Sequence, residues 1–168
     1  ISDLSVLKDN NTKSHLFSNF MGKLDNNALI ELNLEKVFND KYLKVNDIES
    51  PLINNNSKLY SYLSYQNSDQ NYFLSTSVGA YEDLGKPKDD RYEFIYPEFS
   101  FYKEFGQKNN SSGNFTFSSD GYNKNYNTNV SENILINDII YNSNLDTFGN
   151  GFTKNYKVLL RNINTNAK

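Results

Sequence analysis

The chain has no cysteine, no tryptophan and one methionine among its 168 residues. Without cysteine it can form neither a disulfide framework nor a thiolate metal site, which excludes thiol and redox chemistry. Alanine is scarce and asparagine is abundant. Both features disfavour long helices, because alanine is the best helix former and asparagine competes for backbone hydrogen bonds.

An excess of basic residues is also missing. The 17 Lys and Arg side chains are outnumbered by 20 Asp and Glu, so the formal net charge is -3 and nucleic acid is not expected as a partner. No stretch reaches the ~20 apolar residues that a membrane-spanning helix needs, and no signal peptide follows Ile1. Because the first residue is not Met and the last residues end abruptly at Lys168, we expect a piece of a longer protein.

Aromatic residues supply much of the apolar content, with 13 Tyr and 12 Phe, and rings favour strands. The clearest alternation lies in Ala28–Glu35, where Ile30, Leu32 and Leu34 share one face and Glu31, Asn33 and Glu35 share the other. This period of two predicts a strand with one apolar face. The preceding segment His15–Leu24 and the turn residues 25–27 predict a hairpin with it.

Further strands are expected over Lys58–Gln66, Asn71–Tyr81, Tyr92–Phe105, Asn114–Ser119, Ile134–Tyr141 and Tyr156–Ile163, whereas residues 2–9 are too short to assign. Residues 67–70 and 109–113 are expected as turns, and 41–56 and 82–91 as polar loops. Pro97 indicates an edge or a bulge, with Ile95, Phe99 and Phe101 on its face. About eight strands predict an all-β, antiparallel up-and-down meander with short connections at one end and long loops at the other, as in outer-membrane barrels.

Candidate chemistry is sparse. His15 is the only histidine and no nucleophile motif accompanies it, which favours a polar strand residue over a catalytic one. The acidic pairs Asp89–Asp90 and Asp40 with Asp47 lack calcium-loop spacing and are interpreted as solvated loop charges. Glu31 and Glu35 share a face and could act as paired carboxylates, but simple wetting residues are favoured. We expect no enzymatic activity, no metal and no cofactor.

Several segments, taken in order, resemble the barrel region of the LptD family, the outer-membrane proteins that assemble lipopolysaccharide. They are His15–Phe17, Val37–Leu43, Leu59–Leu63, Tyr72–Leu74, Asp90–Glu98 and Asn114–Ser119, with Asp120–Tyr122 as the turn that follows. The most specific are Phe-Asn-Asp-Lys-Tyr-Leu at 38–43 and Tyr-Glu-x-x-x-Pro-Glu at 92–98. The resemblance covers roughly residues 14–120.

This resemblance implies that residues 1–168 are a partial transmembrane outer-membrane β-barrel, a fragment of an LptD-like barrel domain. It implies a non-enzymatic translocon in the cell outer membrane, with lipopolysaccharide as cargo, an LptE-like plug lipoprotein and a periplasmic Lpt bridge as partners, and no cofactor. Ile30, Leu32 and Leu34 would face lipid. Glu31, Asn33 and Glu35 would face the lumen, where a polar wall could pass a charged headgroup while acyl chains leave sideways.

Two alternatives share the same alternation. Another outer-membrane barrel, of the porin or TonB-dependent transporter type, would have similar strands. A secreted β-sandwich carbohydrate-binding module would also have aromatic strands and long loops, but one face of each strand would pack inside and the other would be wetted. Flanking sequence distinguishes them, because a barrel continues with more alternating strands and a module ends in a linker.

Overall fold

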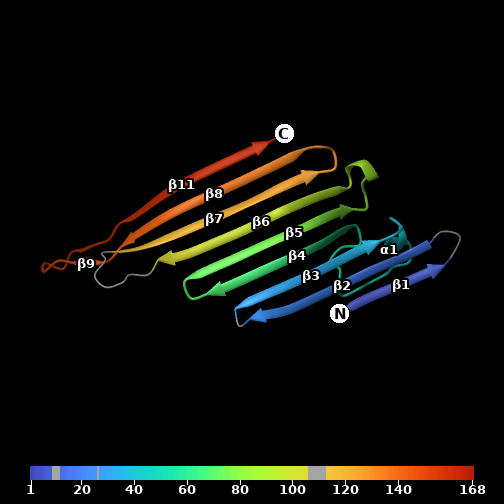
Figure 1. The fold of residues 1–168 in the computed structure, drawn as a ribbon, viewed down its shortest axis with the longest axis horizontal. Coiled ribbons are helices and arrows are strands. Elements are labelled where there is room, and N and C mark those ends of the chain that lie inside the picture. The colour runs from blue at the N-terminus through green and yellow to red at the C-terminus, as the bar shows by residue number, and fades with distance from the viewer. Residues whose placement is uncertain (9–11, 26, 106–112) are drawn as a thin grey trace.

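The computed structural model describes residues 1–8, 12–25, 27–105 and 113–168. One antiparallel sheet contains nine strands in sequence order (Figure 1): β1 Ser2–Lys8, β2 Thr12–Asp25, β3 Ala28–Val37, β4 Lys58–Asp69, β5 Tyr72–Asp83, β6 Tyr92–Phe105, β7 Gly113–Tyr126, β8 Ser131–Ser143 and β11 Lys157–Ala167. Between β8 and β11 the chain forms a small hairpin of β9, Asp146–Thr147, and β10, Thr153–Lys154. The expected all-β antiparallel meander is confirmed.

The sheet is open along both edges. Within the described residues, β1 pairs only with β2, and β11 pairs only with β8. The two edge strands lie on opposite sides of the sheet (Figure 1). Each edge therefore presents unpaired backbone groups that could accept a further strand.

Two predicted turns are wrong because cross-strand pairing overrides local turn propensity. β7 runs straight through Asp120–Tyr122, and β4 continues to Asp69, so that only residues 70 and 71 turn. Gly121 lies opposite Phe99, and a Cβ atom added to it would stand 3.0 Å from the Phe99 ring. This glycine serves close packing within a strand. Residues 109–112 of the third predicted turn lie outside the described residues, and Gly113 begins β7.

The expected arrangement, with short connections at one end of the sheet and long loops at the other, is not found. The tight connections after Asp25 and Asp69 share one end with the long excursion that carries β9 and β10 (Figure 1). The opposite end holds the long connections 38–57 and 84–91 together with the short connection 127–130. Both ends therefore mix short and long loops.

Pro97 marks a bulge in β6, as its position in a strand predicted. The register of β6 with both neighbouring strands shifts between Ile95 and Glu98. The one extra residue of this bulge reverses the alternation of side chains. Ile95 therefore lies on the face of Glu98, and its predicted grouping with Phe99 and Phe101 is wrong.

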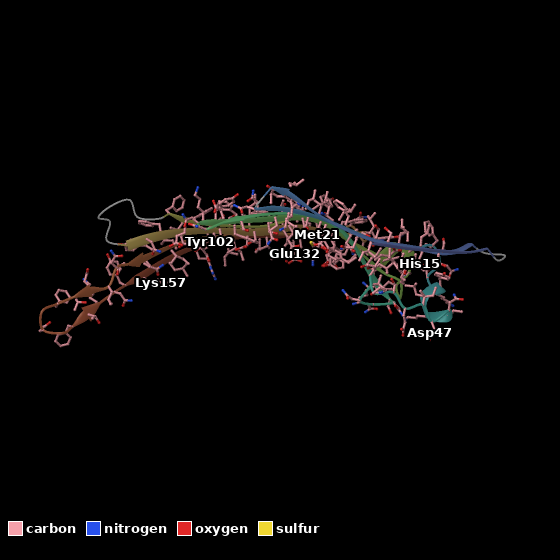
Figure 2. All side chains as sticks on the ribbon, turned by 90° about the horizontal axis from the view of Figure 1, so that it is seen from below. His15, Met21, Asp47, Tyr102, Glu132 and Lys157 are labelled. Atoms are coloured by element: carbon pink, nitrogen blue, oxygen red, sulfur yellow. The ribbon has the colours of Figure 1, made fainter. Side chains whose placement is uncertain are left out.

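The buried hydrophobic cluster lies beneath the connection 38–57, of which residues 41–56 were expected to be a polar loop. This connection contains the short helix α1, Tyr42–Val45, and the core residues are Phe17, Val37, Tyr42, Leu43, Leu59 and Leu84. Ile48, Leu52 and Ile53 of the same connection pack against them. Seen along its edge, the sheet bows, and α1 lies with Asp47 on the concave side (Figure 2). The connection is therefore folded back onto the concave face.

An ion pair joins the connections 38–57 and 84–91. The guanidinium of Arg91 donates two hydrogen bonds of 2.8 Å to the carboxylate oxygens of Asp40, and a third of 3.0 Å to the carbonyl of Lys86. The Arg91 side chain is buried, and its hydrogen bonds and charge lower the pKa of Asp40. Asp40 is therefore not a simple solvated loop charge, as the sequence analysis expected.

We predict that Asp40→Asn destabilises the refolded chain by about 1–3 kcal/mol, because it weakens the hydrogen bonds of a buried guanidinium. Because the pKa of Asp40 is lower in the folded than in the unfolded chain, this contribution is present above about pH 4 and is lost as the pH falls through the folded-state pKa. Urea unfolding at about pH 6 and about pH 3 measures both effects. Asp89→Asn, at an exposed aspartate nearby, is the control. Equal stability of the two variants at both pH values would contradict the prediction.

Candidate functional site: two chemically different faces

The sheet separates the two sets of β3 residues that the sequence singled out. Ile30, Leu32 and Leu34 share one face, and Glu31, Asn33 and Glu35 share the other. Glu35 lies directly opposite Phe17, which packs beneath α1, so the second set is on the concave face. The two predicted groups are therefore on opposite faces, and the polar group faces the side covered by the connection 38–57.

The convex face carries exposed apolar rows, together with a polar row of Ser119, Asn137 and Asn162 across β7 to β11. Direct cross-strand neighbours form apolar rows across it, such as Phe20–Leu32–Leu63–Val78 over β2 to β5 and Phe105–Phe115–Tyr141–Val158 over β6 to β11. Leu63 is 43% exposed, Phe115 is 50% exposed and Leu160 is 63% exposed. Within the described residues no helix or strand lies over the convex face (Figure 2). Large apolar side chains thus remain uncovered over the width of the sheet.

The concave face carries ion pairs and polar networks. The ammonium of Lys124 lies 2.9 Å from Glu93, and the guanidinium of Arg161 lies 2.6 Å from Asp138. The face is less polar at its C-terminal side, where cross-strand neighbours of β8 and β11 include Ile136 opposite Ile163 and Ile140 opposite Leu159. Polar character is therefore strongest over β2 to β7.

Asn33 and Glu35 bridge a place where β3 and β4 diverge. Regular pairing of these strands stops at Asn33 and Tyr62. Beyond that pair, a carboxylate oxygen of Glu35 accepts a 2.8 Å hydrogen bond from the Tyr60 backbone N–H, and the Asn33 side chain donates one of 2.8 Å to the Tyr60 carbonyl. Asn33 is 7% exposed and Glu35 is 8% exposed. Glu35 thus replaces a missing backbone partner, and its interpretation as a wetting residue is wrong.

Three tyrosine rings stack on the concave face in the order Tyr62, Tyr60, Tyr81. The ring centroids of Tyr60 and Tyr81 are 3.9 Å apart with planes inclined by 8°, and those of Tyr60 and Tyr62 are 4.8 Å apart. Gly79 makes room for the middle ring, since a Cβ atom at this position would stand 2.9 Å from Tyr60 Cε2. Sequence analysis missed this stack. The i, i+2 spacing of Tyr60 and Tyr62 was its only local signal.

A cavity lies on either side of this tyrosine stack. One, of about 310 Å³, is lined by Tyr62 and Tyr60, by Asn19, Asn33 and Glu35, and by residues of the connection 38–57. The other, of about 370 Å³, is lined by Tyr81, Arg91, Glu93 and Tyr126 among others. Lys58 lines both cavities. Both volumes lie in the range of small-molecule sites.

His15 is part of the packing beneath α1. It is buried, its ring stacks on Phe17 at 4.5 Å, and its Nε2 lies 3.3 Å from a carboxylate oxygen of Asp3. Among residues 1–8, 12–25, 27–105 and 113–168, no group of three or more His, Cys, Asp or Glu could hold a metal ion. In the same ranges, no helix has both the length and the apolar character needed to cross a membrane.

The ion pair of Asp40 with Arg91 brings the segments 38–43 and 92–98 together. Asp40 belongs to the segment 38–43. Its partner Arg91 immediately precedes the segment 92–98 in the sequence. Beside this pair, Glu82 accepts hydrogen bonds from the Tyr92 hydroxyl at 2.7 Å and from the Lys36 ammonium at 2.8 Å. Segments about fifty residues apart thus form one network at the end of β3, β5 and β6.

Comparisons with models of protein families, with curated proteins and with solved structures found no match to this chain. A functional proposal therefore rests on the two faces of the sheet, on its open edges and on the network around Arg91.

We predict that Gly79→Ala displaces Tyr60 from the stack and destabilises the chain by about 1–3 kcal/mol, as overpacking typically does. The added methyl group would meet the Tyr60 ring on one side and the Ser61 carbonyl, at 3.2 Å, on another. Urea unfolding measures the loss of stability, and near-UV circular dichroism reports the tyrosine packing. Gly149→Ala is the control, because a Cβ atom there has no neighbour within 4 Å. An unchanged tyrosine signal in Gly79→Ala would refute the stack.

Proposed function

We propose that this chain supplies nine strands of an outer-membrane β-barrel, and that the barrel is a lipopolysaccharide translocon of the LptD type. The observation that carries the proposal is the exposure of the two faces. On β3 the apolar Leu34 is 38% exposed, whereas the polar Asn33 and Glu35 are buried. In a water-soluble sandwich the apolar face would be covered instead. The strands of outer-membrane barrels likewise have an apolar face toward lipid and a polar face toward the interior.

The dimensions of the sheet support a membrane-spanning role. A transmembrane β-strand needs about 9–11 residues. The strands β2 to β8 contain between 10 and 14 residues each. An open edge is costly in hydrocarbon, because its backbone groups lack hydrogen-bond partners unless another strand or another copy of the chain pairs with it. We therefore propose that further strands pair with β1 and β11 and close the barrel.

The translocon type rests on the resemblance of the segments 38–43 and 92–98 to the LptD family. The network around Arg91 joins these segments and fixes the connection 38–57 to the loop before β6. In this proposal Ile30, Leu32 and Leu34 contact lipid, and Glu31, Asn33 and Glu35 lie on the side of a polar lumen, where Asn33 and Glu35 are themselves buried. Lipopolysaccharide is the cargo, the partners are an LptE-like plug lipoprotein and the periplasmic Lpt bridge, and the role is non-enzymatic.

The absence of tryptophan and cysteine allows a direct test of the two faces. Leu63→Trp places a single tryptophan on the convex face, and Ser64→Trp places it on the concave face of the same strand. After refolding into vesicles, lipids with brominated acyl chains should strongly quench the fluorescence of Leu63→Trp, because bromine quenches on contact. They should quench Ser64→Trp weakly. Equal quenching of both, or of neither, would contradict a lipid-facing convex surface.

The same two variants test the cargo. Addition of lipopolysaccharide to vesicles of phospholipid should change the emission of Ser64→Trp and leave that of Leu63→Trp nearly unchanged. A phospholipid added in its place is the control. Quenching that separates the two faces without any response to lipopolysaccharide would favour another type of outer-membrane barrel.

A further inference from the structure

The cavity of about 310 Å³ on the concave face has chemically different walls. Pro51 and Leu52 from the connection 38–57 form an apolar wall, and the ring of Tyr62 lies among the sheet residues of the other. Asn33 and Glu35 supply polar groups between them. Sites for small molecules combine apolar and aromatic walls with a few placed polar groups in this way.

The polar groups from the sheet are held in place. The Asn33 side chain donates to Glu35 at 3.0 Å and to the Tyr60 carbonyl at 2.8 Å, and Glu35 also accepts from the Tyr60 N–H. The Asn19 side chain donates to Glu31 at 3.0 Å. Because these side chains are already fixed, a ligand would not have to order them, which lowers the entropic cost of binding.

Other groups at the cavity are free to bind. Within the part of the chain that the structure describes, the Lys58 ammonium and the Asn54 amide have neither a hydrogen bond nor an ion pair, although both residues line the cavity. Tyr62 is the end ring of the stack, so Tyr60 covers only one of its faces. The cavity thus offers one free cation, one free amide and a tyrosine ring that stacks on another ring with only one of its faces.

We propose that this cavity binds a neutral saccharide of one or two sugar units. A sugar ring has an apolar C–H face that can lie on Tyr62, and its hydroxyl groups both donate and accept, as amides also do. The carboxylate of Glu35 disfavours an anionic ligand, and Lys58 serves as a hydrogen-bond donor to hydroxyl oxygens. The proposal depends on the cavity alone and goes beyond the membrane role.

Saturation-transfer NMR on the refolded chain, with glucose, galactose and N-acetylglucosamine as probes, tests this site. At least one sugar should bind the unaltered chain. The double variant Lys58→Met with Asn54→Ala should weaken that binding about tenfold, because each hydrogen bond lost typically costs a few-fold in affinity. Tyr62→Leu should weaken it further, because the aromatic face is removed.

The double variant Lys23→Met with Asn27→Ala is the matched control, since it makes the same two changes at exposed positions away from the cavity. Its affinity should equal that of the unaltered chain, and far-UV circular dichroism should be the same for all variants. The proposal is overturned if none of the three sugars binds, or if the cavity variants bind as tightly as the control. Neither outcome depends on lipid, so a failure here is distinct from a failure of the membrane proposal.

Discussion

Each strand of this sheet places alternate side chains on opposite faces, and the antiparallel register keeps those faces aligned from β1 to β11. The rest of the structure depends on this alignment. It gathers the leucine and phenylalanine rows on the convex face, where nothing in the described residues covers them. At the bulge around Pro97, β6 contains one extra residue, whereas the neighbouring strands continue to alternate, and Ile95 and Glu98 therefore lie on one face. A register slip of one residue would move all the side chains of a strand to the opposite face.

The concave face carries several contacts between residues far apart in the sequence. The connection 38–57 lies there on a small hydrophobic core, and the bidentate pair of Asp40 with Arg91 ties it to the next long connection. Near the place where β3 and β4 separate, Glu35 replaces a backbone partner and Tyr60 stacks between two other rings. The result is a fixed, polar and aromatic surface opposite an apolar one. That asymmetry suits a wall between lipid and water, and it also forms cavities of small-molecule size.

Sequence reasoning predicted those features that depend on a period of two. Ile30, Leu32 and Leu34 alternate without interruption, so their common face could be read directly. Sequence reasoning failed where contacts between residues far apart in the sequence determine the role of a side chain. Gly121 reads as a turn residue until the ring of Phe99 is seen across the strand pair, and Glu35 reads as a wetting residue until Tyr60 is placed beside it. The pairing of Asp40 with Arg91 joins residues of two loops, for which no local pattern exists. Chemical character was therefore predictable, and contacts made across the sheet were not.

The most direct test of the account is whether this fold needs a lipid-like environment. An exposed apolar face of this extent should drive aggregation in water. The chain, dissolved in urea, would be diluted into buffer with and without detergent micelles and followed by far-UV circular dichroism and analytical sedimentation. The account predicts cooperative β-structure in a monodisperse form only when micelles are present. A cooperatively folded monomer in plain buffer would contradict it and would favour a water-soluble β-sandwich.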